Sequence, residues 1–224
     1  SNREIYWMIV LHYLQYSRAF RILWALEELQ LHYQIRFYKR QPNLSAPEEL
    51  KAIHPLGKSP VLQDEQQVLA ESAVILDVLQ QRYDQAGLFK PNPEIQDDAY
   101  QYLYWMHYAE GSLMPLLVFQ LVMSNVPSRV PFLIRPIAKK VCEGVKAGFL
   151  QPRLKDHVAY IESYLTEHEY FAGAFSFADI QMSFPLQAIS KRTQLDIPHI
   201  RAFLARIQQR DAFQRAQETD GHYQ

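Results

Sequence analysis

Three short polar segments in the first third of the chain carry the side chains whose chemistry could be put to use. The residues concerned are Tyr16, Ser17, Lys58, Ser59, Glu71 and Ser72. A serine at the start of a helix stands beside free backbone amides, and these amides and the helix dipole attract an anion. Taken one at a time, each serine also fits a plain helix cap, and each charged residue fits a solvated side chain.

The elements that must position these residues follow from hydrophobic periodicity. The apolar run at 8–13 predicts a buried strand, and apolar residues at helical spacing predict a helix over 18–30 with Ser17 as its N-cap. Further elements are expected in the order strand, helix, strand, strand, helix, at 35–38, 47–50, 60–62, 68–69 and 72–83. The predicted order is therefore βαβαββα.

The character of the sequence changes near residue 87. Gly87 and the proline-rich cluster at 90–93 predict a linker. Everything beyond it predicts helices, at 94–122, 132–168, 177–191 and 198–209. In the second of these, Gly144, Gly148 and Pro152 are positions where a helix can bend or break.

Composition excludes several classes of protein. The 224 residues have a formal net charge of -1, so no strong field favours nucleic acid or a membrane surface. No pair among the eight histidines has a metal-ligand spacing with a third ligand nearby, so we expect no metal site. Cys142 is the one cysteine, which excludes an internal disulfide, and cysteine's habit of burial favours a structural thiol. The longest apolar run, at 113–122, is about half a transmembrane span, which favours a cytoplasmic protein.

Three motifs resemble those of the glutathione transferase superfamily. The segment Ile-His-Pro-Leu-Gly-Lys-Ser-Pro at 53–60 is similar to its N-P-x-G-K-V-P strand, and Glu-Ser-Ala-Val-Ile at 71–75 to its E-S-x-A-I motif. Ser-Phe-Ala-Asp at 176–179 is similar to its S/T-x-A-D capping motif, in which Asp179 would reach back to Ser176. The motifs occur in the family's order and spacing, and they look closest to a theta-like branch of bacteria and fungi. The resemblance implies a thioredoxin-like α/β domain over 1–86 and an all-α domain over 95–224.

By this resemblance the polar segments hold glutathione. The Ser59–Pro60 bond would be cis, and the backbone of Ser59 would pair with the ligand's cysteine residue as an added strand does. Lys58 would approach the glycine carboxylate. Ser72 and the amides of its helix would bind the γ-glutamyl carboxylate, and Glu71 would accept its ammonium group.

The group that ionises the thiol is expected in the loop at 14–18, where the family places its catalytic Tyr, Ser or Cys. The loop contains no cysteine, which disfavours the classes that form a mixed disulfide with the enzyme. Ser17 is the expected catalytic residue, because its hydroxyl can donate to a thiolate at a helix N-terminus. The usual theta-class serine aligns nearer Leu14, so Tyr16 and activation by the backbone alone stay open.

The resemblance implies a glutathione transferase of detoxification, whose bound thiolate attacks a hydrophobic electrophile or a peroxide. Glutathione-dependent disulfide exchange and a non-catalytic glutathione-binding scaffold are the alternatives. The helical domain would supply the pocket for the second substrate, and the protein would be a two-fold homodimer. We expect neither nucleic acid nor a membrane among its partners.

Overall fold

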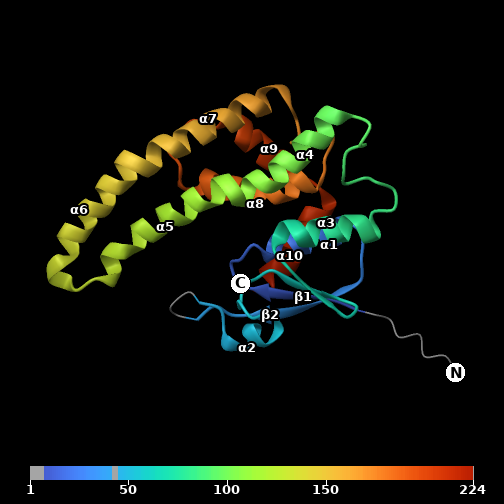
Figure 1. Ribbon diagram of the computed structural model, residues 1–224, viewed down its shortest axis with the longest axis horizontal. Coiled ribbons are helices and arrows are strands. Elements are labelled where there is room, and N and C mark those ends of the chain that lie inside the picture. Colours follow the sequence, from blue (N-terminus) through green and yellow to red (C-terminus); the bar gives the residue numbers. More distant parts are fainter. Residues whose placement is uncertain (1–7, 42–44, 224) are drawn as a thin grey trace. The chain divides into compact units, whose positions relative to one another are not determined.

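The computed structural model describes residues 8–41 and 45–223 (Figure 1). The chain divides into two compact units, Ser1–Asn92 together with Arg206–Gln224, and Pro93–Ala205. The domain bounds expected from the linker, 1–86 and 95–224, stay a prediction.

A four-stranded sheet forms the centre of the first unit. Its strands, in the spatial order β2-β1-β3-β4, are β1 (Ile9–Leu14), β2 (Tyr33–Tyr38), β3 (Val61–Asp64) and β4 (Gln67–Ala70). β1 runs parallel to β2 and antiparallel to β3, and β3 is antiparallel to β4. The carboxyl ends of β1, β2 and β4 therefore meet the beginning of β3 at one edge of the sheet.

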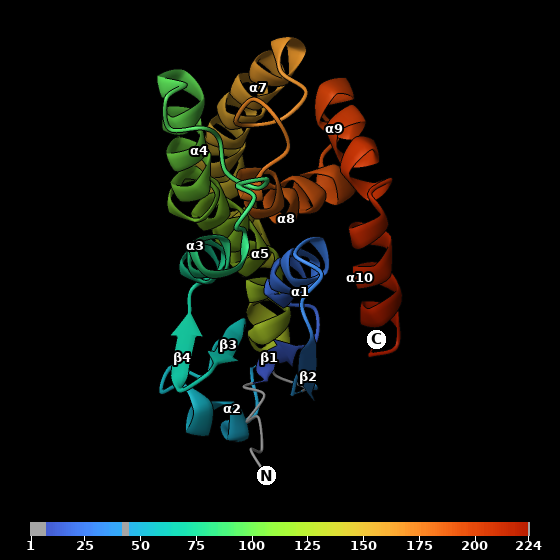
Figure 2. The ribbon, with the colours of Figure 1, turned by 90° about the vertical axis from the view of Figure 1, so that its right-hand side faces the viewer.

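Three helices complete the predicted βαβαββα order, which is confirmed. They are α1 (Ala19–Glu28), α2 (Glu48–Ile53) and α3 (Ser72–Tyr83). Figure 2 shows α1 and α3 side by side on one face of the sheet, with α2 on the other. Fully buried Leu11 from β1, Leu23 from α1 and Leu79 from α3 contribute to the core of this unit.

A further helix, α10 (Asp211–Gly221), belongs to the first unit and was not predicted from the sequence. It packs on α1, where the ring of Phe213 stands edge-on to Trp24 with centroids 5.0 Å apart. Arg210, just before it, forms an ion pair with Glu28 at 2.6 Å. Only Ala212, Phe213 and Ala216 of α10 are buried, so its apolar pattern is too sparse to predict a helix.

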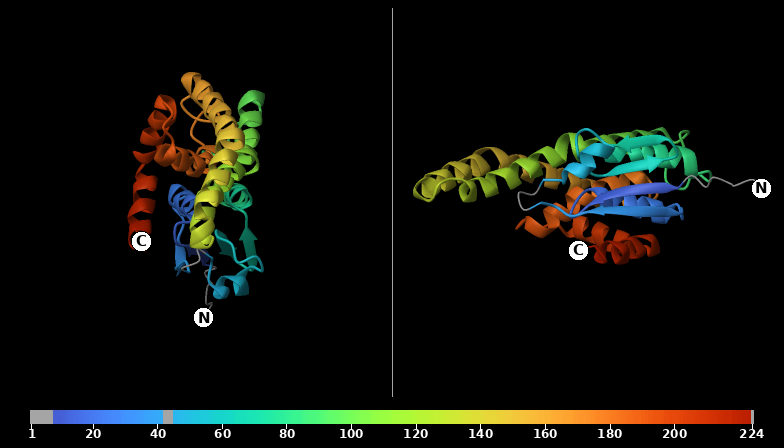
Figure 3. Two further views of the ribbon diagram at one scale, coloured as in Figure 1. Left: turned by 90° about the vertical axis from the view of Figure 1, so that its left-hand side faces the viewer. Right: turned by 90° about the horizontal axis from the view of Figure 1, so that it is seen from below.

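The second unit is helical, as predicted. Its α-helices are α4 (Gln96–Tyr108), α5 (Met114–Arg129), α6 (Arg135–Val145), α7 (Gln151–Glu167) and α8 (Phe177–Arg192), and α9 (Pro198–Gln208) begins in it. A π-helical turn at Ala109–Leu113 joins α4 to α5, and another at Lys146–Leu150 joins α6 to α7. The second predicted long helix therefore passes Gly144, Gly148 and Pro152 with a π turn and without a break. Figure 3 shows the two long composite helices lying alongside each other.

Aromatic packing and a capped helix fix the core of the second unit. Trp105 of α4 is fully buried, and its ring lies 4.7 Å from that of Phe171 and 4.9 Å from that of Tyr164. The predicted capping box of α8 is confirmed: the Ser176 hydroxyl accepts from the backbone of α8, and Asp179 accepts from the Ser176 amide at 2.8 Å. Asp179 also accepts from the Phe171 amide at 2.9 Å, so the cap ties α8 to the segment that precedes it.

Candidate active site

A pair of hydrogen-bonded serines joins the β1–α1 loop to the beginning of β3. Ser59 Oγ donates to the His12 carbonyl at 3.1 Å and accepts from the Leu14 amide at 3.1 Å. A hydroxyl has one proton, so in the 3.2 Å bond between Ser17 Oγ and Ser59 Oγ the donor is Ser17. Ser17 Oγ in turn accepts from the Ala19 amide at 3.1 Å. The Ser17 hydroxyl must therefore turn away from Ser59 before it can donate to a ligand.

The loop itself is held by β2 and by the residue beyond it. The Gln15 amide donates to the Tyr38 carbonyl at 2.9 Å, and Arg40 Nε donates to the Gln15 carbonyl at 2.8 Å. Tyr16 has a φ of 53° and its side chain is exposed. The N-cap position of α1 is Arg18, without a side-chain cap, so the expectation that Ser17 is the N-cap is wrong by one residue. Ser17 nevertheless satisfies the first amide of the helix.

The segment before β3 has the backbone expected of it. The Ser59–Pro60 peptide bond is cis, which confirms that prediction. Pro60 is buried and the Lys58 side chain is exposed. Because His12 and Ala70 both pair with Val61, the beginning of β3 lies between the ends of β1 and β4.

The third polar segment stands where β4 meets α3. Glu71 is exposed and has a φ of 69° and a ψ of 123°, a backbone conformation that residues with a side chain rarely adopt. Ser72, the first residue of α3, is buried, and its hydroxyl accepts from Arg21 Nη2 at 3.0 Å. The first amides of a helix have no partner within it, so the beginning of α3 is suited to an anion at the sheet edge.

Two buried residues that the sequence did not single out support this edge. Arg21 on α1 is fully buried and holds Ser72. His12 in β1 is also fully buried, and burial lowers its pKa, so it is neutral at pH 7. His12 Nε2 donates to Gln63 Oε1 at 2.8 Å, and its Nδ1 accepts from the Tyr38 hydroxyl at 2.7 Å. Their partners lie on other elements, so no local pattern could have found them.

A metal site is not formed by the part of the chain that the structure describes, since no three of its His, Cys, Asp or Glu residues cluster. The sheet edge instead offers hydroxyls, helix amides, a carboxylate and an ammonium group. Such a set can bind a small zwitterionic molecule and can stabilise an anion, so it suits a ligand with several charged ends.

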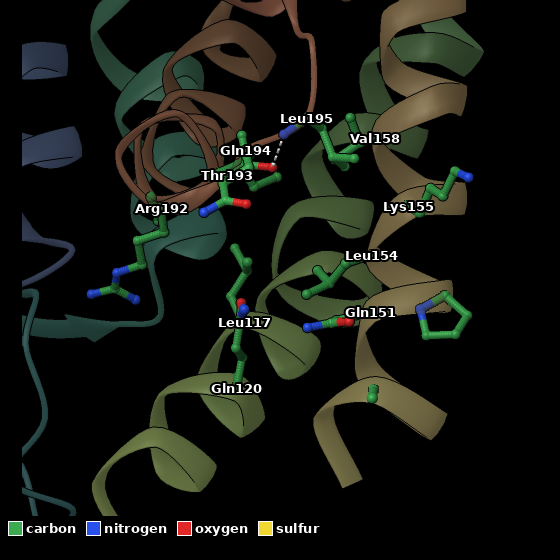
Figure 4. Close-up of a pocket in the computed structure, with 14 residues that line it drawn as sticks. Leu117, Gln120, Gln151, Leu154, Lys155, Val158, Arg192, Thr193, Gln194 and Leu195 are labelled. Carbon is green, nitrogen blue, oxygen red and sulfur yellow. Dashed lines mark hydrogen bonds between the residues drawn. The ribbon is translucent and has the colours of Figure 1, made fainter. Parts of the chain in front are cut away.

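A separate pocket lies inside the second unit (Figure 4). Its volume is about 760 Å³, and its lining includes apolar residues of α5 and α7 such as Leu117, Leu154 and Val158. The amide-bearing side chains of Gln120 and Gln151 reach toward the cavity from these two helices, whereas the charged ends of Lys155 and Arg192 point away. The pocket therefore suits an uncharged apolar molecule that accepts or donates a few hydrogen bonds.

Together the thioredoxin-like sheet, its polar edge and the all-helical unit define a protein of the glutathione transferase fold. The family described as "Glutathione S-transferase, N-terminal domain" matches residues 7–81. The chain is 36% identical to Glutathione S-transferase 1 of Saccharomyces cerevisiae over 223 residues, which cover 94% of either chain. It is 38% identical over 185 residues to Glutathione S-transferase 3 of Schizosaccharomyces pombe, covering 82% of this chain and 75% of that one.

Among solved structures, a glutathione S-transferase from Actinobacillus pleuropneumoniae is similar over 96% of this chain and 93% of that one. The TM-score is 0.78 and the sequence identity 33%. This chain belongs to the glutathione S-transferase family.

Proposed function

We propose that this glutathione transferase binds glutathione along the sheet edge where β1, β3 and β4 meet, and that Ser17 activates its thiol. The observation that carries the proposal is the 3.2 Å hydrogen bond between Ser17 Oγ and Ser59 Oγ. Ser59 is the residue whose backbone would pair with the cysteine of glutathione. The Ser17 hydroxyl therefore lies beside the expected position of the sulfur.

Activation follows from a change of hydrogen-bond partner. A free thiol has a pKa of about 8.5 and is mostly protonated at neutral pH. When the ligand binds, the Ser17 hydroxyl turns from Ser59 to the sulfur and stabilises the thiolate. Ser59 keeps its bonds to His12 and Leu14, so the loop does not lose its anchor when Ser17 turns. The thiol proton passes to water, and the thiolate then attacks either a hydrophobic electrophile, whose leaving group departs, or a peroxide, whose O–O bond breaks.

The two ends of glutathione are held on either side of the sulfur. Ser72 and the first amides of α3 bind the γ-glutamyl carboxylate, and Glu71 accepts the ammonium group beside it. Ser59 and Pro60 hold the central cysteine, and the exposed Lys58 approaches the glycine carboxylate. Supporting this arrangement, β3 pairs with both β1 and β4, so the three segments share one edge.

The test of Ser17 is the ultraviolet absorbance of bound thiolate, titrated in the Ser17→Ala variant. Losing a charge-assisted hydrogen bond of about 1.5–3 kcal/mol raises the pKa of bound glutathione by about 1–2 units. Turnover at neutral pH falls about ten- to a hundredfold and partly recovers at higher pH, whereas glutathione affinity changes little. Tyr16→Phe is the matched control. A Ser17→Ala variant that titrates like the parent protein would leave Tyr16, or the backbone alone, as the activating group.

We further propose that the pocket between α5 and α7 holds the apolar part of the second substrate. Ala147 lines this pocket and is exposed, so Ala147→Trp fills the cavity without disturbing the core. We expect a KM for an activated aryl halide that rises about tenfold or more, as for the loss of one well-buried contact, with the KM for glutathione unchanged. Ala159→Trp, exposed on α7 outside the pocket, is the control. Equal KM values in both variants would place the second substrate elsewhere.

A cytoplasmic homodimer with a role in detoxification completes the proposal. We still do not expect the protein to bind nucleic acid, because the net charge of the whole chain is near zero. The expectation that a membrane is also no partner is replaced by the inference that follows.

A further inference from the structure

The turn between α5 and α6 carries a group of solvent-exposed apolar side chains. Phe132 and Leu133 in this turn are 76% and 86% exposed, and Ile137 and Val141 on α6 are 67% and 60% exposed. With Ile134 they form what we call the hairpin face. α5 and α6 pack on each other, and the turn lies at the far end of the pair from the rest of the second unit (Figures 1 and 3). Large apolar side chains gathered at an exposed end mark an interaction surface.

The apolar surface continues along α5. The composite helix Gln96–Arg129, of 34 residues, is long and apolar enough to cross a membrane by length and composition. Helices that form the core of soluble proteins pass the same test when they are mostly buried, but only 22% of the apolar window is buried here. The exposed side chains of α5 include Val118, Phe119, Leu121 and Val122. Exposed apolar side chains therefore extend from α5 to the hairpin face.

The charges around this surface are nearly all positive. Residues 111–142 contain no Asp or Glu, and the cations in and beside the turn and on α6 are Arg129, Arg135, Lys139 and Lys140. The nearest acidic residue, Glu143, lies 3.9 Å from Lys139 and pairs with it. Because the whole chain has a net charge of -1, this basic region is balanced by acidic residues elsewhere. Such a distribution favours an anionic partner at this end of the second unit.

We propose that the hairpin face docks on the surface of an anionic lipid bilayer. Phe132, Leu133 and Ile137 enter the boundary between headgroups and acyl chains, and the flanking cations bind the anionic headgroups. Apolar side chains on one face and Lys or Arg beside them are the features of segments that lie on a membrane without crossing it. The proposal does not depend on the glutathione site.

Two other occupants fit the hairpin face less well. In a two-fold contact between copies of this chain, the same patch meets itself, and the four cations would then face their own copies. A protein partner would need a cavity shaped for the projecting Phe132 and Leu133, whereas a bilayer accepts apolar side chains without a preformed cavity.

A groove beside the hairpin face gives lipid a further place to lie. Its volume is about 600 Å³, and its lining is Phe119, Val141, Gly144, Val145, Gly148 and Phe149. Apart from the backbone of its own helix and its chain neighbours, nothing lies within 4 Å of where a side chain would begin at Gly144 or Gly148, so the floor of the groove is open. The lining has no charged side chain and shares Val141 with the hairpin face, so an acyl chain can continue into it from the bilayer.

Flotation with lipid vesicles tests the proposal on the whole protein. We expect the protein to float with vesicles of phosphatidylcholine containing about a third phosphatidylglycerol, and to stay behind with pure phosphatidylcholine. Binding weakens as salt rises from about 50 to 500 mM, because headgroup charges are screened. Arg135→Gln with Lys140→Gln weakens partitioning about 10- to 30-fold. Phe132→Ser with Leu133→Ser weakens it at least as much.

Matched variants separate the hairpin face from general effects of charge and apolar area. Lys191→Gln with Arg201→Gln removes two exposed cations of the second unit, and Leu103→Ser removes an exposed apolar side chain of α4. Both controls float like the parent protein. Absence of flotation with anionic vesicles would overturn the proposal, as would equal flotation of the Phe132 and Leu133 double variant. A double variant that instead changes from dimer to monomer in sedimentation would show that the face joins two copies.

Discussion

The Ser72 hydroxyl serves both the fold and the proposed site, because it accepts a hydrogen bond from the buried Arg21 guanidinium. Ser72→Ala removes this hydrogen bond to the buried Arg21 guanidinium, which costs about 1–3 kcal/mol of stability. We expect urea unfolding to show this loss and calorimetry to show weaker glutathione binding in the same variant.

The Glu71→Ala variant tests binding of the γ-glutamyl end of glutathione without the loss of stability expected for Ser72→Ala. The Glu71 side chain is exposed, so Glu71→Ala should change the free energy of unfolding by no more than about 0.5 kcal/mol. Loss of the charge-assisted bond to the ammonium group weakens glutathione binding about 10- to 100-fold. If Glu71→Ala and Ser72→Ala both bind glutathione like the parent protein, the γ-glutamyl end docks elsewhere.

For single residues, the sequence predicts where the polar segments are but not which hydrogen bonds from other elements hold them in place. The serines and Glu71 stand in short contiguous motifs, so they can be read from one stretch of chain. Arg21 and His12 resemble any polar residue in an apolar run, and their partners come from α3, β2 and β3. The direction of the Ser17 proton depends on Ser59, 42 residues away, so it too needed the fold.

Among the elements, α8 has a titratable cap. Burial raises the pKa of Asp179 to about 7 from its ordinary value of 3.8. Between these values the unfolded carboxyl is charged and the folded one holds a proton, so folding takes up a proton. The stability that Asp179 contributes is complete below about pH 4 and is lost as the pH rises through about 7.

Asp179→Asn tests this dependence. Thermal unfolding from pH 5 to 8 should show a smaller decline of stability in the variant, by up to about 1.4 kcal/mol per pH unit. Asp97→Asn changes an exposed carboxylate at the start of α4 and should keep the parent slope. Equal slopes in Asp179→Asn and the parent protein would mean that the buried carboxyl is already ionised at pH 5.

Periodicity predicted the elements wherever one face is apolar. The strands of the sheet, α3 and α8 agree with their predicted bounds to within a few residues. α10 was not predicted because its three buried residues are surrounded by polar ones, and these buried residues become apparent only when the helix packs on α1. The π turns at 109–113 and 146–150 have no signal in hydrophobic spacing, since the chain stays helical on both sides.

On the scale of the whole molecule, we predict a two-fold homodimer in solution. Sedimentation at micromolar concentration should give twice the chain mass of 26.3 kDa. The Phe132 and Leu133 double variant should sediment in the same way, because the hairpin face is assigned to lipid. A single-chain mass for the parent protein would contradict the dimer.

The position of α10 in the sequence also determines when the first unit can finish folding, because the whole second unit is synthesised between α3 and α10. The sheet and α1 leave the ribosome before α10, the helix that covers Trp24. Chains fold from the N-terminus during synthesis, so the sheet and α1 keep an uncovered aromatic surface while the second unit emerges. A chain that lacks residues 206–223 would keep this aromatic surface exposed. Protein quality control could then recognise the truncated chain by that surface, which the folded protein does not expose.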